Sequence, residues 1–148
     1  MPTNERTLEQ RRAQDALAAV RKLEEDGSYG KYVSYVKGLP AAILQNGLGQ
    51  ALATLLAGAK LNKRERRSED ERAREALYRH LSAWLRRDAP EAPYRKHADL
   101  MEAVIANDED HYLRAQAEAL AYLTWLKKLA VAYLREAGPQ AGGKEEGG

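Results

Sequence analysis

Three histidines, His80, His97 and His111, are the first side chains to weigh for catalysis or metal binding. In residues 108–111, Asp-Glu-Asp-His, a carboxylate precedes a histidine by three residues, which is the spacing that one helix of a di-iron bundle uses. Such a site needs a second Glu-x-x-His motif and further glutamates on facing helices, and the chain has no second copy. Asp108 has a simpler role as a negative charge at a helix N-terminus. We therefore expect no metal site.

The other two histidines fit structural roles better than catalytic ones. His80 falls on the inner edge of a predicted helix beside Leu77, Leu81 and Trp84, where a hydrogen-bonded, partly buried histidine is expected. His97 stands near a helix start and is interpreted as a cap. The chain also lacks a glycine-rich phosphate loop, a G-x-S-x-G motif and a strand to carry either. We therefore expect a protein that is not an enzyme and has no cofactor and no small-molecule substrate.

Positive charge is concentrated in the middle of the chain. Residues 60–100 carry twelve basic and eight acidic side chains, whereas the formal net charge of the whole chain is only +2. Residues 60–67, Lys-Leu-Asn-Lys-Arg-Glu-Arg-Arg, hold five positive charges and one negative charge. Arginine outnumbers lysine by fifteen to nine, which favours bidentate contacts with phosphate or carboxylate. A bulk polyanion binder would be far more basic, so any nucleic-acid contact must be local.

Apolar residues recur at helical spacing along the whole chain, and no alternating pattern is long enough for a strand. We therefore expect an all-α fold, a single-domain bundle of about six helices. The first helix should be capped by Thr3 or Asn4 and end at Gly27. Later starts are marked by a capping box at 68–71 and by Asp108, whose helix should run to about residue 136. A short fifth helix should direct its apolar side chains inward: Leu100, Met101, Val104 and Ile105.

The segment from residue 38 to residue 59 contains no charged residue. Leu39 precedes Pro40, and the residue before a proline is biased away from helical geometry, so we expect a helix break at Gly38-Leu39 and a new helix over 40–59. Its length would span a bilayer, but amides and glycines occupy its centre, which favours a buried core helix over a membrane span. We expect this helix and the 112–135 helix to lie at the centre of the fold.

The ends of the chain are expected to add little to this bundle. The helical domain should cover residues 1–137, and the Gly-, Gln- and Glu-rich segment 138–148 should be a disordered tail. The N-terminus shows no basic patch followed by an apolar run, so we expect no signal peptide and a cytoplasmic location. The absence of cysteine excludes disulfides and thiolate metal sites.

One stretch, residues 35–52, has a more specific pattern. It reads Tyr-Val-Lys-Gly-Leu-Pro-Ala-Ala-Ile-Leu-Gln-Asn-Gly-Leu-Gly-Gln-Ala-Leu, in which Lys37 and Pro40 lead into an apolar helix that contains Asn-Gly-Leu. This pattern resembles the small helical subunit of type III-B CRISPR effectors, the Cmr complexes. The resemblance covers roughly residues 29–56, and the chain length and the leading helix agree with it. An aromatic residue often follows the glycine-rich turn in that family, where this chain has Thr54 and Leu55.

The resemblance implies a non-catalytic structural subunit. Such subunits line the inside of a filament built on guide RNA, stack head to tail and help to hold the guide–target duplex, while RNA cleavage belongs to the backbone subunits. The implied partners are other Cmr subunits, further copies of the same chain, CRISPR RNA and target RNA. A duplex that is held without regard to sequence is gripped through its phosphates, by lysine and arginine. The candidate RNA-binding residues are Lys37, Lys60, Lys63, Arg64, Arg66, Arg67 and Arg74.

A plainer interpretation of the same residues stays open. These cations are then solvated surface charges, some of them neutralised by Glu65, Glu69 and Asp70. The protein is in that case a helical protein–protein adaptor without RNA contact, and it binds through the apolar 40–59 helix. The two hypotheses differ in one measurement, because only RNA contact makes binding to RNA-loaded assemblies fall steeply with salt.

Overall fold

The computed structural model describes residues 6–27 and 29–136, and this part of the chain contains helices and connections but no strand. The helices are α1 (Leu8–Asp26), α2 (Gly30–Asn46), α3 (Leu48–Ala59), α4 (Glu69–Leu85), α5 (Leu100–Ala106) and α6 (Glu109–Tyr133). They form one all-α domain, which confirms the fold class predicted from helical spacing. The segment 138–148, expected to be a disordered tail, lies outside the described residues.

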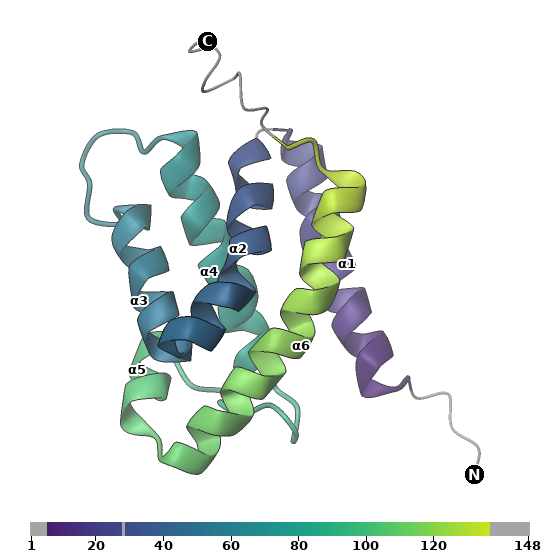
Figure 1. Cartoon of the computed structure of the whole chain (residues 1–148), viewed down its shortest axis with the longest axis vertical. Coiled ribbons are helices and arrows are strands. Elements are labelled where there is room, and N and C mark those ends of the chain that lie inside the picture. Colours follow the sequence, from purple (N-terminus) through teal and green to yellow (C-terminus); the bar gives the residue numbers. More distant parts are fainter. Residues whose placement is uncertain (1–5, 28, 137–148) are drawn as a thin grey trace.

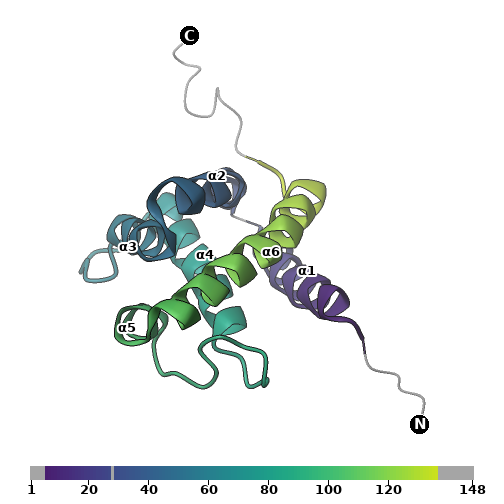
Figure 2. The same cartoon turned by 60° about the horizontal axis from the view of Figure 1, so that its bottom comes forward.

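Helix α6 is the long central element of the bundle (Figure 1). Helix α1 packs along one side of it, and α2 and α4 pack on the other. Helix α3 packs against α2 and α4, with the short α5 beside it, and Figure 2 shows the same order from a second direction. The predicted central position was therefore right for α6, but α3 forms the side of the bundle opposite α1.

Helix α1 starts at Leu8, and the prediction of Thr3 or Asn4 as its cap was wrong. Thr7 is the N-cap: its hydroxyl accepts a hydrogen bond from the Gln10 amide at 3.0 Å, and the Gln10 side chain accepts one from the Thr7 amide at 2.9 Å. This reciprocal capping box satisfies two of the amides that a helix start leaves unpaired. Gly27 ends the helix in the left-handed conformation, as predicted.

Helix α2 does not break at Gly38-Leu39 but continues through Pro40. A proline removes one backbone donor from the helix, but packing of an apolar face can hold the helix on both sides of it. The buried stripe of α2 continues across the proline: Tyr32, Val36, Leu39 and Ile43. The break comes instead at Gly47, whose φ of 89° and ψ of 156° are open to glycine alone.

The uncharged segment 38–59 is therefore not one continuous helix. Its first part belongs to α2, which turns toward α3 in its lower half (Figure 1), and its second part is α3. No helix in the ranges that the structure describes combines the length and the apolarity that a membrane crossing needs.

Helices α4 and α6 start at the caps that the sequence predicted. The Ser68 hydroxyl accepts from the Glu71 amide at 3.1 Å, and the Glu71 carboxylate accepts from the Ser68 amide at 2.9 Å. The Asp108 carboxylate accepts from the His111 amide at 3.0 Å. In both helices the acidic residues of the first turn also complement the positive end of the helix dipole.

Helix α5 departs from the prediction at two residues. Its cap is Asp99, whose carboxylate accepts from the Glu102 amide at 3.0 Å, so the assignment of His97 as a cap was wrong. Ile105 was expected to point inward but is 75% exposed. A helix of seven residues has room for only one short apolar stripe, and the buried positions of α5 are Leu100, Ala103 and Val104.

A largely buried polar cluster joins α1, α4 and α6. Glu118 accepts two hydrogen bonds from Arg12, at 2.7 and 2.8 Å, and a third from the Trp84 indole at 2.8 Å. Burial alone would raise the pKa of Glu118, but the Arg12 and Trp84 hydrogen bonds outweigh burial and leave that pKa lowered. Trp84 stacks on Tyr122, whose hydroxyl donates to Asp15 at 2.6 Å. These directional contacts fix the three helices in one arrangement.

A candidate nucleic-acid interface

The basic connector, residues 60–67, is the loop that joins α3 to α4 (Figure 1). Lys60 leaves α3 in the left-handed conformation, with a φ of 55°, and its carbonyl accepts from the Lys63 amide at 3.0 Å. At the other end of the connector, the Arg67 guanidinium donates to the Ala59 carbonyl at 3.2 Å. These bonds fasten the connector to the end of α3.

Two of the predicted RNA-binding residues form ion pairs with the first turns of α4. Lys63 Nζ lies 3.0 Å from Glu71, and Arg67 Nη2 lies 2.5 Å from Glu75. The pKa of Glu71 is lowered mainly by the hydrogen bond from the Ser68 amide at the helix cap and, to a smaller extent, by the hydrogen bond from Lys63. Burial would raise the pKa of Glu75, but hydrogen bonds from Arg79 and Arg67 lower it overall. Both carboxylates are therefore ionised at neutral pH and neutralise their partners.

Arg74 packs between three helices. Its guanidinium lies 4.5 Å from the centre of the Tyr35 ring in α2 and 3.3 Å from Asp70 on its own helix. A side chain at Gly58 of α3 would collide with the same guanidinium. Only 29% of the Arg74 side chain is exposed to solvent. Asp70 was one of the acidic partners that the plainer interpretation named, and this ion pair is confirmed.

Lys37 lies apart from the other candidates. Its Nζ pairs at 3.2 Å with Glu136, which follows α6, and the Ser34 hydroxyl donates to the same carboxylate at 3.3 Å. The end of α6 and the basic connector lie on opposite sides of α2 (Figure 1). The structure therefore does not bring Lys37 together with the connector.

Lys60, Arg64 and Arg66 are the predicted residues that stay available for a ligand. All three are exposed. None of them makes an ion pair with an acidic side chain in the part of the chain that the structure describes. They stand within seven residues on one loop, so one bound strand can reach all of them.

Sequence reasoning missed a row of arginines on α4. Arg72 and Arg79 of α4, and Arg86, the residue that caps its C-terminal end, are spaced by seven residues, about 10 Å along a helix, and they fall opposite the buried stripe of α4. The side chain of Arg79 is the most open at 72% exposed, whereas Arg86 donates to the His97 carbonyl at 2.6 Å and so holds the following loop. Arginines at intervals of two helical turns, on a helix whose other side is apolar, are the signal that could have revealed this row.

Arg79 extends the basic connector onto α4. Glu75 lies between Arg67 and Arg79, at 2.5 and 2.6 Å from their guanidinium nitrogens. Leu61 of the connector lines the same open hollow of about 420 Å³ as Arg79. We name Lys60, Arg64 and Arg66, which have no ion pair among the described residues, together with the open but Glu75-paired Arg79, the connector–α4 surface.

The histidines have structural partners. The Tyr32 hydroxyl lies 2.6 Å from His80 Nδ1, and burial lowers the pKa of His80 to about 4, so this imidazole is neutral and hydrogen-bonded as predicted. His111 Nδ1 lies 2.8 Å from Asp108, the cap of its own helix. Within residues 6–27 and 29–136, no group of three His, Asp or Glu side chains is placed to hold a metal ion.

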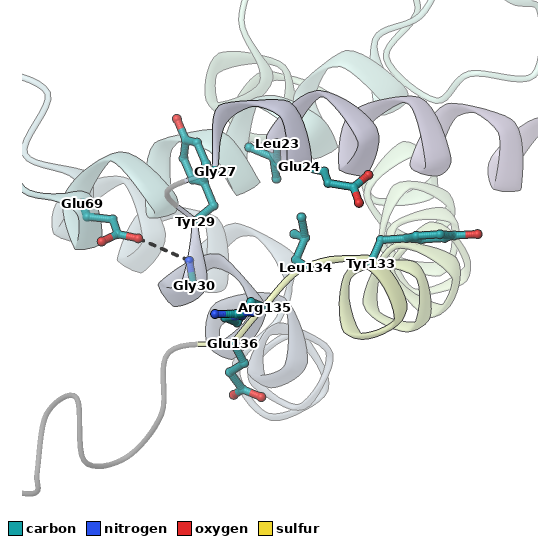
Figure 3. Close-up of a pocket in the computed structure, with 10 residues that line it drawn as sticks. All are labelled: Leu23, Glu24, Gly27, Tyr29, Gly30, Glu69, Tyr133, Leu134, Arg135 and Glu136. Carbon is teal, nitrogen blue, oxygen red and sulfur yellow. Dashed lines mark hydrogen bonds between the residues drawn. The ribbon is translucent and has the colours of Figure 1, made fainter.

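The hollow drawn in Figure 3 is a poor site for an anion. It measures about 560 Å³ and lies where α1 ends, α2 starts and the chain leaves α6. Glu24, Glu69 and Glu136 line it together with a single cation, Arg135. Glu69 also accepts from the Gly30 amide at 3.3 Å, a bond that serves the start of α2. A phosphate would meet more negative than positive charge here, which favours the connector–α4 surface as the candidate interface.

Known proteins share this architecture. A family model described as CRISPR-associated protein (Cas_Cmr5) matches residues 8–133, from the first residue of α1 to the last residue of α6. An X-ray crystal structure of a CRISPR-associated Cmr5 family protein from Thermus thermophilus is similar to 87% of this chain and 98% of that chain. The two sequences are 30% identical over the match, and the TM-score is 0.63. The similarity therefore extends well beyond residues 29–56.

Proposed function

The chain belongs to the Cmr5 family of CRISPR-associated proteins, and from this premise we propose its role. It is a non-catalytic structural subunit of a type III-B Cmr effector complex and stacks along the filament of that complex. It helps to hold the guide–target RNA duplex through contacts with the phosphates. Its partners are other Cmr subunits, further copies of itself, CRISPR RNA and target RNA.

The observation that supports RNA contact is the set of three exposed cations without an ion pair in the described residues, Lys60, Arg64 and Arg66. Such a cation can approach a phosphate, and displace the counterions of the nucleic acid, without first breaking an ion pair within the protein. Lys63 and Arg67 would have to give up Glu71 and Glu75, so they are weaker candidates than the sequence suggested.

The non-catalytic part of the proposal is supported by the positions of the titratable groups. A general acid or base must come within hydrogen-bond reach of the proton that it moves. His80 is buried against Tyr32, and His111 is paired with Asp108 on the first turn of its helix. His80 directly follows Arg79 of the connector–α4 surface, but its ring is buried against Tyr32, and His111 lies on the first turn of α6, outside that surface.

The test replaces Lys60, Arg64 and Arg66 by alanine in the assembled complex. Each phosphate contact contributes roughly 0.7, for a single strand, to 0.9, for duplex DNA, to the slope of log affinity against log salt. Loss of three contacts should therefore flatten the slope for target-RNA binding by about 2 to 3 per subunit. A matched control replaces three other exposed lysines, Lys22 on α1 and Lys127 and Lys128 on α6, and should keep the parent slope.

The second candidate function is the protein–protein adaptor. The adaptor is favoured by the surface of α2 and α3. No charged side chain occurs there from residue 38 to residue 59, and the apolar side chain of Leu44 is 71% exposed. An unchanged salt slope in the triple variant, with assembly intact, would support the adaptor and contradict RNA contact through the connector.

A further inference from the structure

Four residues in the described chain have a positive φ, and two of them are lysines. Gly27 and Gly47, at 80° and 89°, adopt it readily, because glycine has no Cβ to clash with the backbone. Lys60, at 55°, and Lys96, at 64°, adopt it against that clash, which is uncommon for a residue with a side chain. The backbone at both lysines would therefore be more stable with glycine.

The side chains of these two lysines give the fold little in return. Both are exposed, and Lys60 makes no ion pair with the residues that the structure describes. The Lys96 side chain is 69% exposed, and its Nζ lies 3.9 Å from Asp88, a carboxylate that already accepts a 2.7 Å hydrogen bond from Arg95. An exposed ion pair of this length contributes almost nothing to stability. Strained residues without an internal role are typical of sites that meet a ligand.

The two lysines lie at opposite ends of α4. Lys60 starts the connector that leads into this helix. The Lys96 amide donates to the carbonyl of Arg86, the C-cap of α4, at 2.9 Å, and the Arg86 guanidinium donates to the His97 carbonyl at 2.6 Å. Helix α4 has 17 residues and is therefore about 25 Å long, enough for several consecutive phosphates of one strand.

One open hollow of about 420 Å³ runs between the two ends. Leu61, which follows Lys60, and Ala98, two residues after Lys96, both line it, and the exposed Arg79 lies between them. Two carboxylates also line the hollow. Glu75 is neutralised by its two arginine partners, and Asp99 accepts the amide hydrogen bond that caps α5. The free positive charge therefore stands at the two ends and at Arg79.

We propose that Lys96 is a second phosphate contact and that one RNA backbone follows α4 from Lys60, past Arg79, to Lys96. The inference rests on the proposed RNA-binding function and extends it beyond the connector. A lysine is a flexible point charge, which suits phosphates that are held without regard to sequence. An acidic protein segment fits less well, because protein interfaces are centred on apolar contacts and Leu61 is the one large exposed apolar side chain in this hollow.

The first experiment compares Lys96→Gln with Lys96→Gly in the assembled complex. Either change should flatten the slope of log affinity for target RNA against log salt by roughly 0.7 to 0.9 per subunit, because one phosphate contact is lost. The isolated Gly variant should melt about 2–4 °C above the parent, because the clash is relieved, whereas the Gln variant should melt like the parent. A contact made for RNA thus predicts a more stable protein that binds RNA less well.

Two control variants define what the first experiment shows. Lys96→Arg keeps the charge and should keep the parent slope, and Lys22→Gln removes an equal charge from an exposed position on α1 and should do the same. A parent slope for Lys96→Gln, or no rise in melting temperature for Lys96→Gly, would overturn the inference. If the connector variant flattens the slope and Lys96→Gln does not, only this inference fails. If neither does, the proposed RNA contact fails as well.

The second experiment identifies what lies against Lys96 by replacing it with a lysine analogue that carries a photoreactive diazirine. Crosslinking in the complex loaded with guide and target RNA should join this position to RNA. Crosslinks to protein alone would point to an acidic segment of a neighbouring subunit and would overturn the inference. The same analogue at Lys22 should give no crosslink to RNA.

Discussion

The connector–α4 surface and the α2–α3 groove differ in how far the fold itself uses their side chains. Around the connector, Lys63 and Arg67 are paired with Glu71 and Glu75, and only part of the positive charge remains for a ligand. The groove between α2 and α3 is lined mainly by uncharged residues such as Leu39, Ala42 and Leu55, and its one charged lining residue, Arg74, is paired with Asp70. A count of charges in the sequence therefore overstates the charge that a binding surface offers, because ion pairs within the fold already use part of it.

The largest effect is expected where the uncharged region enters the core. Leu48→Asp would place a carboxylate at a fully buried position and should remove about 4 kcal/mol or more of stability, enough to unfold the domain. Leu44→Asp, four residues earlier and 71% exposed, should melt close to the parent. Thermal unfolding followed by circular dichroism separates the two, and equal melting of both variants would contradict the buried position of α3.

The next largest effect concerns the buried hydrogen bond between Tyr32 of α2 and His80 of α4. The pKa of His80 is about 4 in the folded chain against 6.5 for an exposed histidine, so the unfolded chain binds more protons between these values. The stabilising contribution is complete above pH 6.5 and is lost as pH falls toward 4, by about 3 kcal/mol in total.

His80→Gln keeps an acceptor for the Tyr32 hydroxyl but does not titrate. Urea unfolding at several pH values should show a drop in stability between pH 6.5 and 4 that is about 3 kcal/mol smaller for this variant than for the parent. Parallel pH profiles would mean that His80 is not the group responsible.

A pair of glycine substitutions sharpens the comparison within α2 and α3. Gly47→Ala forces a side chain into a backbone conformation that glycine alone adopts and against the Tyr112 hydroxyl, which should cost about 1–3 kcal/mol. Gly38→Ala should instead stabilise the protein by about 0.5–1 kcal/mol, because alanine favours the helix and meets nothing. Opposite signs in denaturant unfolding are the expected result, and destabilisation by both would show that the fold needs Gly38.

The smallest effects are expected within the basic connector. Arg67→Ala removes the ion pair with Glu75 and the bond to the Ala59 carbonyl, which should cost about 1 kcal/mol. Arg66→Ala should change stability by no more than about 0.5 kcal/mol, because its side chain is exposed and makes no ion pair with the described residues. If Arg66→Ala proved as costly as Arg67→Ala, the division of the connector into engaged and available cations would be wrong.

The parts of this fold that the sequence could predict are those set by neighbours within one helical turn. Ser68 with Glu71, and Asp108 with the amide of His111, are three residues apart, so residue types alone identified both caps. Thr7 and Gln10 have the same spacing and could have been found in the same way. The path of α2 through Pro40 could not, because it depends on packing against α4 and α6 rather than on local propensity.

The candidate site was less predictable, because its ion pairs depend on the path of a loop. Lys63 and Glu71, like Arg67 and Glu75, are eight residues apart with a turn and a helix start between them. Spacing along the sequence does not indicate such contacts. The burial of Arg74 against Tyr35 likewise needs α2 and α4 to be adjacent in space. The RNA-binding role of the remaining cations stays a prediction.

The Arg12–Glu118 pair also shows how far apart along the chain the packing partners α1 and α6 are. Its partners are 106 residues apart, and α1 packs mainly on α6. On the ribosome, α1 is made before every other helix, yet its main partner is made after all of them. At roughly 5–20 residues per second, the apolar stripe of α1 stays without that partner for about 5–20 seconds. During this interval α2, α3 and α4 can already pack together, while the apolar face of α1 is exposed and can be bound by a chaperone.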